Sequence, residues 1–318
     1  MSVVTAFAPA TVSNVGCGFD VLGFALEEPG DEVTARWEPG NGIGGVRIDD
    51  IVNDGGRLPR DAAKNTAGVA ASALLRRVGE RRGVALTIRK GLPLSSGLGG
   101  SAASAVAAAV AVAALCGVRL PIETLLACAF EGERDGAGSA HADNIAPALF
   151  GGLVLVRQPD PPDVIRLPVP PGLTAVVVHP DLEIETANAR ALLGTTVPLE
   201  DAIQQWANLG ALVDALHRAD LALLARALHD SIAEPRRAGL IPGLDAIKRA
   251  ALDAGAIGCS LSGSGPSLFA LCDGRDRALL VAAAMDAAVR AHIGGEPQTY
   301  VSRIAPQGAR VITPSCAS

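Results

Sequence analysis

The apolar residues of the chain gather in short runs, and the spacing within each run predicts its secondary structure. Runs rich in valine, isoleucine and leucine that end at turn-forming residues predict strands at residues 3–8, 33–37, 84–88, 153–156, 174–178, 259–261 and 267–272. Segments with apolar residues three and four apart predict helices at residues 65–78, 101–116, 199–216, 221–233, 244–254 and 278–292, and another begins near Pro121. The first strand is expected to end at Pro9, and residues 39–59 are expected to form turns. Strands and helices follow one another without a strict period, which favours an α+β fold over a doubly wound sheet.

One proline-rich segment, residues 158–162, divides the chain into two parts of similar length. Its sequence Gln-Pro-Asp-Pro-Pro is typical of a linker, because proline stiffens the backbone and cannot donate a hydrogen bond. A length of 318 residues is typical of two domains or of one large domain. We therefore predict one domain at residues 1–157 and a second at residues 163–318.

The composition argues against several classes of partner. Only 3% of the residues are aromatic and the net charge is −6, so the chain lacks the aromatic and basic surface that nucleic acids require. The start of the chain shows no basic region followed by an apolar run, and the uncharged run at residues 102–116 is shorter than the roughly 20 residues of a membrane span. The six cysteines have no metal-ligand spacing and are expected to be buried thiols. We therefore expect a cytoplasmic protein without nucleic-acid or membrane partners.

The clearest chemical signal is a glycine-rich stretch directly before the helix at residues 101–116. Gly97, Gly99 and Gly100 allow the backbone to approach a ligand closely, and the free N–H groups at the start of a helix attract an anion. No lysine follows Gly100, so the stretch differs from the P-loop pattern G-x-x-x-x-G-K-[ST]. Taken alone, it also fits an ordinary glycine turn before a structural helix.

Two further glycine-containing blocks, at residues 9–23 and 260–267, change that picture. The three blocks together resemble the GHMP kinases, whose central pattern is P-x-x-x-G-L-[GS]-S-S-A. The resemblance implies a two-domain α+β fold with the active site between the domains, and ATP and Mg²⁺ as cofactors. It implies adenine contacts from Asn65 and Lys90, and a phosphate-binding loop of Pro93, Leu94, Ser95, Ser96, Gly97, Leu98, Gly99, Gly100, Ser101, Ala102 and Ala103. It also implies a supporting glycine turn of Ser262, Gly263, Ser264 and Gly265.

Within that family the chain is most similar to the branch that phosphorylates homoserine, through residues 13–23, 139–147, 185–190 and 232–243. The resemblance implies that Arg190 and Arg237 bind the carboxylate of homoserine, for which forked arginine donors are well suited. Asp20, with Asn14 beside it, would bind the ammonium group. Asn144 would hold the γ-hydroxyl, with His141 nearby.

The same resemblance implies that Glu133 and Ser101 hold the magnesium ion, with Glu131 as the alternative to Glu133. Asn144 stands where mevalonate kinases have an aspartate base, and an amide cannot accept a proton. The resemblance gives no base role to the neighbouring Asp143. The expected reaction is therefore transfer of the γ-phosphoryl group of ATP to homoserine without a strong side-chain base, as part of threonine biosynthesis.

Several alternatives remain open at this level. Arg190 and Arg237 could be solvated helix residues, His141 a structural histidine and Asp20 a helix cap. The chain could act on a mevalonate-like acceptor, or it could be a catalytically silent sensor that binds ATP and a metabolite. Gly100 stands where the family usually has a serine, and we expect this change to weaken nucleotide binding at most. A homodimer is a family expectation.

Overall fold

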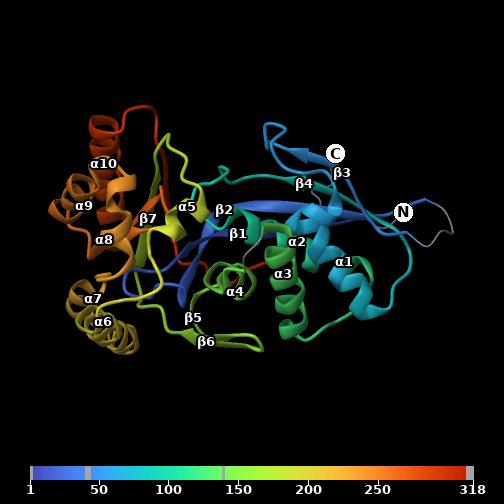
Figure 1. Cartoon of the computed structure of the whole chain (residues 1–318), viewed down its shortest axis with the longest axis horizontal. Coiled ribbons are helices and arrows are strands. Elements are labelled where there is room, and N and C mark those ends of the chain that lie inside the picture. The colour runs from blue at the N-terminus through green and yellow to red at the C-terminus, as the bar shows by residue number, and fades with distance from the viewer. Residues whose placement is uncertain (1–2, 40–43, 138–139, 313–318) are drawn as a thin grey trace.

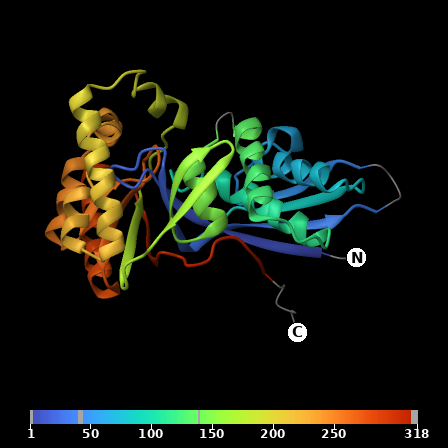
Figure 2. The same cartoon turned by 90° about the horizontal axis from the view of Figure 1, so that it is seen from below.

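The computed structural model describes residues 3–39, 44–137 and 140–312 of the chain, which form two sheets with helices packed against them (Figures 1 and 2). The larger sheet has seven strands in the order β11-β1-β2-β4-β3, with β5 paired to β2 and β6 paired to β5. Its strands are β1 (Val3–Ser13), β2 (Leu22–Trp37), β3 (Val46–Val52), β4 (Val84–Arg89), β5 (Leu153–Pro159), β6 (Pro162–Leu167) and β11 (Arg310–Ile312). The predicted mixture of strands and helices, an α+β fold, is confirmed.

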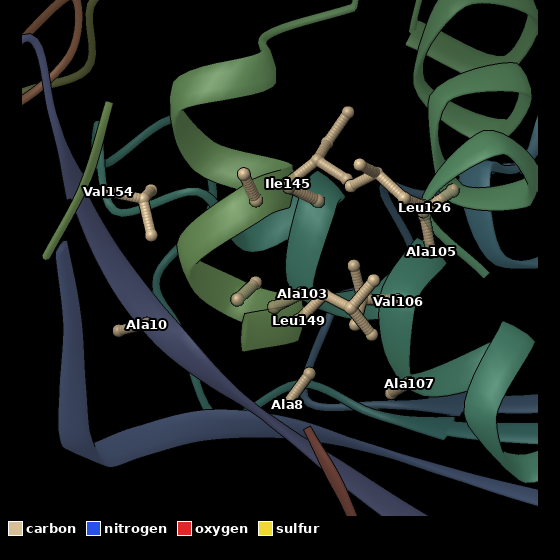
Figure 3. Packing of buried hydrophobic residues seen from close by; sticks show 14 of the residues in the cluster. Ala8, Ala10, Ala103, Ala105, Val106, Ala107, Leu126, Ile145, Leu149 and Val154 are labelled. Carbon is tan, nitrogen blue, oxygen red and sulfur yellow. The ribbon is translucent and has the colours of Figure 1, made fainter. Parts of the chain in front are cut away.

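Four helices cover this sheet: α1 (Thr66–Val78), α2 (Gly100–Leu115), α3 (Ile122–Ala137) and α4 (Ala142–Phe150), with the short 3-10 helix η1 (Ala62–Lys64) before α1. The alanine-rich α2 packs on β1 and β2, and its small side chains allow α1, α3 and α4 to pack closely around it. Figure 3 shows Leu149 of α4 beside Val106 of α2, and Leu126 of α3 beside Ala105 of α2. Because neighbours bury α2 on nearly every side, its position beneath the glycine-rich loop is fixed.

The smaller sheet has four strands in the order β10-β7-β9-β8. They are β7 (Leu173–His179), β8 (Gly258–Leu261), β9 (Leu268–Asp273) and β10 (Gln298–Arg303). Successive residues of β7 face opposite cores: Val177 packs in the first apolar cluster, whereas Val176 and Val178 pack in the second. Burial on both faces explains why β7 is a continuous apolar run rather than an alternating one.

The remaining helices surround this second sheet. They are α5 (Thr186–Ala191), α6 (Leu199–Arg218), α7 (Leu221–Ala227), α8 (Ala233–Arg237), α9 (Leu244–Asp253) and α10 (Arg275–His292), with the 3-10 helix η2 (Ala238–Leu240). Helices α9 and α10 pack on the sheet, and α6 pairs with α7 at the outer edge of the molecule (Figure 1). The rings of Phe24 on β2 and Phe269 on β9 meet edge to face at 5.8 Å, which joins the two sheets.

Several features differ from the sequence predictions. Strand β1 continues past Pro9 because the pairing register shifts between Pro9 and Thr11, where the ladder needs no proline N–H. Strand β3 lies within the segment predicted to be turns. The helix predicted at residues 221–233 ends at Ala227, because Asp230 accepts the N–H groups of Ile232, Ala233 and Glu234 and so starts α8.

The proline-rich segment at residues 158–162 forms the turn of the β5–β6 hairpin rather than a linker between sheets. Strands β6 and β11, which follow this turn in the sequence, belong to the larger sheet. The division into residues 1–157 and 163–318 therefore stays a proposal, since the final segments of the chain return to the first sheet.

Candidate active site

A cleft of about 400 Å³ is lined by residues from the part of the molecule built on the larger sheet and by residues from the part built on the smaller sheet. Most of the predicted site residues lie in this lining: Asn14, Asp20, Asn65, Lys90, Pro93, Leu94, Ser95, Ser96, Gly97, Gly99, Gly100, Ser101, Glu133, His141, Asn144, Arg190, Arg237, Gly263 and Ser264. The other predicted residues, Leu98, Ala102, Ala103, Ser262 and Gly265, belong to the same loops but do not line the cleft. The fold thus brings together segments that lie far apart in the sequence, from Asn14 to Ser264.

The glycine-rich loop rests directly on the glycine turn that was predicted to support it. Gly97 has a φ of 76°, and a Cβ there would lie 2.5 Å from the carbonyl oxygen of Ser262. The hydroxyl of Ser262 donates to the Gly97 carbonyl at 2.7 Å, and the Ser267 N–H donates to Ser96 at 3.3 Å. Only glycine combines this left-handed conformation with so close an approach of two backbones.

The start of α2 is left open toward the cleft. Gly99 occupies the N-cap with a φ of 66° and provides no side-chain cap, and no acidic residue lies in the first turn. The first N–H groups of the helix therefore keep free hydrogen-bonding capacity, and the helix dipole adds partial positive charge there. This arrangement suits a phosphate group, for which Ser95, Ser96 and Ser101 offer further hydroxyl donors.

Lys90 lies beneath this loop in a buried polar cluster. Its ammonium group is ion-paired with Asp31 and donates to the Gly100 carbonyl at 2.8 Å and to Ser104 at 2.9 Å. Asp31 also accepts the Gly91 N–H at 3.0 Å. The cluster therefore ties the start of α2 to strand β2, and Lys90 supports the loop as well as lining the cleft.

Asn65 likewise has a structural part in the fold. Its side chain caps α1 by accepting the Ala67 N–H at 3.0 Å, and its amide donates to the Pro59 carbonyl at 2.9 Å. The adenine contacts expected of Asn65 and Lys90 stay proposals.

Glu133 is a buried carboxylate of the cleft. It is 1% exposed, and its Oε1 has no hydrogen-bond partner among the described residues. Its other oxygen, Oε2, lies 3.8 Å from Nδ1 of His141, and hydrogen bonding to Glu133 raises the pKa of His141. A buried carboxylate oxygen without a donor is costly unless a cation or ligand satisfies it.

The alternative carboxylate, Glu131, faces away from this site. It forms ion pairs with Arg76 and Arg77 of α1 and does not line the cleft. The structure therefore favours Glu133 over Glu131 as a magnesium ligand. Glu133 and the Ser101 hydroxyl are both oxygen donors of the cleft, which fits Mg²⁺, because this ion commonly takes one or two protein oxygens together with phosphate and water. The described residues include no group of three or more His, Cys, Asp or Glu side chains that could hold a metal ion.

Opposite charges also meet within the cleft. Arg190 of α5 pairs with Asp20 through its two terminal nitrogens, Nη1 at 2.9 Å from Oδ1 and Nη2 at 2.6 Å from Oδ2. Arg237 of α8 is 4% exposed, and its guanidinium donates to the carbonyls of Gly263 at 3.0 Å and Ala189 at 3.3 Å. Burial lowers the pKa of Arg237, yet an arginine at this pKa remains charged. The site therefore presents a forked cation, a second buried cation and a carboxylate within one pocket.

Comparison with known proteins places the chain among relatives of known activity. Models of the N-terminal and C-terminal domains of the GHMP kinases match residues 65–152 and 212–291. A homoserine kinase from Chlorobaculum tepidum is 47% identical over 98% of this chain and 99% of its own length. A homoserine kinase from Pyrococcus abyssi is 42% identical over 83% of this chain and 86% of its own. The chain belongs to the GHMP kinases, among the homoserine kinases.

Solved structures of this family agree with the fold. A homoserine kinase from Cytophaga hutchinsonii superposes with a TM-score of 0.95 at 48% identity, covering 98% of each chain. A mevalonate kinase from L. major in complex with R-mevalonate has a TM-score of 0.72 at 20% identity, which shows a shared fold alone. No helix in the described part of this GHMP kinase is long and apolar enough to cross a membrane.

The surroundings of Asn144 in this GHMP kinase site contain residues that the sequence alone did not single out. Thr11 donates its hydroxyl hydrogen to Oδ1 of Asn144 at 2.7 Å, and the Asn144 amide donates to the Ser13 hydroxyl at 3.1 Å. These two contacts fix which end of the Asn144 amide faces which neighbour. Thr11 and Ser13 lie in the first glycine-containing block, residues 9–23. Their position in that block is the sequence feature that could have identified them as site residues.

Phe19 is a second residue that the sequence analysis did not assign. Its ring lies 5.5 Å from the guanidinium carbon of Arg190 and 5.3 Å from that of Arg237. Cation–π attraction of this kind orients both arginines toward the same space. The loop that carries Phe19 is strained, since Asn14, Val15 and Asp20 have φ values of 70°, 30° and 59°.

Asn14 and Asp143 hold that loop in place. The Asn14 amide donates to the Gly263 carbonyl at 2.7 Å, and its Oδ1 accepts the Asp20 N–H at 3.1 Å. Asp143 is 2% exposed and accepts the Asn14 N–H at 3.2 Å. Burial, reinforced by the nearby charge of Asp20, raises the pKa of Asp143 to about 6.

Proposed function

We propose that this homoserine kinase transfers the γ-phosphoryl group of ATP to the γ-hydroxyl of L-homoserine and forms O-phospho-L-homoserine. The observation that carries the proposal is the pairing of Arg190 with Asp20 beside Arg237, in the same cleft as an open helix start. The charged side chains match the carboxylate and ammonium of an amino acid, and the open helix start matches the phosphates of a nucleotide. The similarity of the chain to known homoserine kinases supports the same activity.

The nucleotide would lie with its phosphates over the loop of residues 93–103. The N–H groups at the start of α2 and the serine hydroxyls of the loop would bind the phosphate oxygens. Glu133 and Ser101 would hold Mg²⁺, which supplies positive charge to the phosphates during transfer. His141, whose pKa is raised by Glu133, adds to the positive charge on that side of the cleft when it is protonated.

The amino acid would bind between two residues that now form an ion pair with each other. In the described structure Arg190 and Asp20 neutralise each other, and neither is fully buried. A zwitterion can insert between them, with its carboxylate on Arg190 and Arg237 and its ammonium on Asp20. Because both charges of the site gain a new partner, breaking the ion pair costs little. A mevalonate-like acceptor has no ammonium and would leave Asp20 without a partner.

The γ-hydroxyl would be held by Asn144 near the transferred phosphoryl group. Because Thr11 already donates to Oδ1 of Asn144, and Ser13 accepts from its amide, the side chain is held in one orientation. An amide cannot remove the hydroxyl proton, so this geometry acts by positioning the acceptor and not by strong base catalysis. A loose transition state, in which little nucleophilic assistance is needed, is compatible with that role.

The proposal is tested by measuring ADP release with homoserine, mevalonate and shikimate as separate acceptors. We expect turnover with homoserine alone, together with growth of a threonine auxotroph that lacks its own homoserine kinase. Turnover with mevalonate instead would favour the alternative acceptor. ATP binding without turnover of any of the three would favour a silent sensor. The expected cytoplasmic location and homodimer are not needed for this proposal.

A further inference from the structure

Gln205 is a buried polar residue on the inner side of helix α6, which also buries Leu212, Ala215 and Leu216. Only 9% of Gln205 is exposed. Burying an amide is costly unless its N–H and C=O groups find hydrogen-bond partners inside the protein. An apolar residue at this position would pack on the core without that cost, so the contacts of the Gln205 amide indicate its role.

The Gln205 amide has partners on two segments of the chain. Its nitrogen Nε2 donates to the Cys17 carbonyl at 3.0 Å and to Oδ1 of Asp230 at 3.0 Å. Its oxygen Oε1 accepts the Ser231 N–H at 2.8 Å. Because Asp230 also accepts the N–H groups that start α8, its carboxylate acts as an acceptor here. The amide therefore uses both its N–H groups and its oxygen, and its nitrogen must face two acceptors.

The two segments are those that carry charged groups of the candidate amino-acid site. Cys17 lies 188 positions before Gln205, in the loop that also carries Asp20. Asp230 lies 25 positions after Gln205 and starts α8, which ends at Arg237. One side chain therefore links the loop of the proposed ammonium site to the helix of the proposed carboxylate site.

The spacing between this loop and α8 matters because the two charged groups of an amino acid are bonded to the same carbon atom. Their partners must therefore stay at one short separation, and a small misplacement of a binding group is costly. The backbone preferences of the loop do not fix it, since Val15 and Asp20 have left-handed φ values of 30° and 59°. The Phe19 ring lies 5.3 Å from the guanidinium carbon of Arg237, which shows how closely the loop approaches α8.

Helix α8 has a separate anchor, so the link through Gln205 is not needed to hold this helix in the fold. Glu234 of α8 accepts the Ser260 hydroxyl at 2.5 Å and the Leu261 N–H at 3.2 Å. It also forms an ion pair with Lys248. These contacts tie α8 to β8 and α9. Loss of the Gln205 amide should therefore leave α8 folded but free to shift relative to the loop.

We propose that Gln205 is a positioning residue, which sets the distance between Asp20 and Arg237 and thereby the affinity of the site for its amino acid. Gln205 lies outside the lining of the cleft and acts through the two segments that it joins. The proposal rests on the proposed function, because it takes Asp20 and Arg237 as partners of homoserine. It adds that a residue of α6 contributes to the binding of homoserine and not to that of ATP.

Steady-state kinetics of two variants, with each substrate varied in turn, tests this role. Gln205→Leu removes all three hydrogen bonds. Gln205→Glu keeps the size and the acceptor oxygen but places a carboxylate oxygen against the Cys17 carbonyl and Asp230. We expect each variant to raise the KM for homoserine about tenfold or more, with the KM for ATP within about twofold of wild type. An unchanged KM for homoserine, or equal rises in both KM values, would overturn the proposal.

Ser302→Ala is the matched control. Ser302 is buried and accepts the Glu27 N–H at 2.8 Å, and neither residue lines the cleft. The variant thus removes a buried hydrogen bond without affecting the link between the loop and α8, and both KM values should stay as in wild type. Circular dichroism checks the folding of every variant. Loss of folding in both Gln205 variants would show a purely structural role in place of the positioning one.

Hydrogen exchange of the protein without substrates tests the link independently of activity. Gln205→Leu should exchange faster than wild type at residues 14–20 and 230–237, and equally fast at residues 93–103. If wild type turns over no homoserine, the proposed function fails, and this measurement still decides whether Gln205 holds the two segments together. Exchange that is unchanged in both segments, or faster throughout the protein, contradicts the link.

Discussion

Arg190 and Asp20 lie 170 positions apart in the sequence and form a two-point ion pair across the candidate substrate site. The pairing raises the pKa of Arg190 further and keeps both side chains oriented in the absence of an amino acid. The charges that we propose for binding homoserine are therefore already assembled, and each is satisfied until the substrate arrives.

The first prediction concerns this pair. Asp20→Asn should raise the KM for homoserine about 10- to 100-fold, because a charge-assisted hydrogen bond contributes about 1.5–3 kcal/mol. The KM for ATP should change little, and steady-state kinetics with each substrate varied in turn measures both. Arg303→Ala, which removes a surface ion pair with Glu27, is the matched control and should leave both values unchanged. An equal rise in both KM values would contradict a specific role in amino-acid binding.

The second prediction separates two carboxylates on α3. Glu133→Gln keeps the size of the side chain but removes its charge, so kcat should fall at least about 100-fold and the Mg²⁺ concentration for half-maximal rate should rise. Glu131→Gln breaks the ion pairs with Arg76 and Arg77 and should leave kcat within twofold of wild type. A magnesium titration of both variants makes the comparison. Comparable losses in the two variants would argue against Glu133 as the metal ligand.

The third prediction concerns two adjacent glycines. A Cβ on Gly99 would lie 2.1 Å from the Thr11 hydroxyl at a φ of 66°, so Gly99→Ala should abolish ATP binding or destabilise the protein by several kcal/mol. At Gly100 the nearest atom would be 3.5 Å away, which leaves room for a side chain. Gly100→Ser should therefore fold normally and lower the KM for ATP about two- to tenfold through one added donor. An unchanged KM for ATP would refute the idea that this position tunes nucleotide binding.

The fourth prediction is a dependence of stability on pH. Because burial raises the pKa of Asp143 from 3.8 to about 6, the folded protein binds this proton more tightly than the unfolded chain does. The resulting stabilisation is complete below pH 3.8 and is lost as the pH rises through about 6. Asp143→Asn should therefore be more stable than wild type at pH 8 by about 3 kcal/mol, and the difference should vanish near pH 4. Thermal melts between pH 4 and pH 8 measure this, and a variant less stable at pH 8 would contradict it.

The sequence predicted the elements whose signals are local. The glycine pattern of residues 97–100 located the loop before α2, and apolar spacing placed α1, α6 and α10 within a few residues. The run at residues 174–178 was also recognisable, because a strand buried on both faces is apolar throughout. In each case neighbouring residues carry the information.

What the sequence could not show depends on distant contacts. Lys90 is ion-paired with Asp31, 59 positions away, and no local pattern identifies that partner. Pro9 does not end its strand, because the bulge that accommodates it depends on pairing with β2. The contacts of the Phe19 ring with Arg190 of α5 and Arg237 of α8 likewise form only when distant segments of the chain fold together.

The pairing of β11 with β1 has a consequence for synthesis of the protein. Thr5 faces Ile312 across this ladder, so the larger sheet is completed by residues some 300 positions apart. At translation rates of about 5–20 residues per second, β1 is synthesised roughly 15–60 s before β11, the strand that pairs with its free edge. During that time its free N–H and C=O groups are open to pairing with other chains. We therefore expect the nascent chain to be most prone to aggregation just before β11 leaves the ribosome.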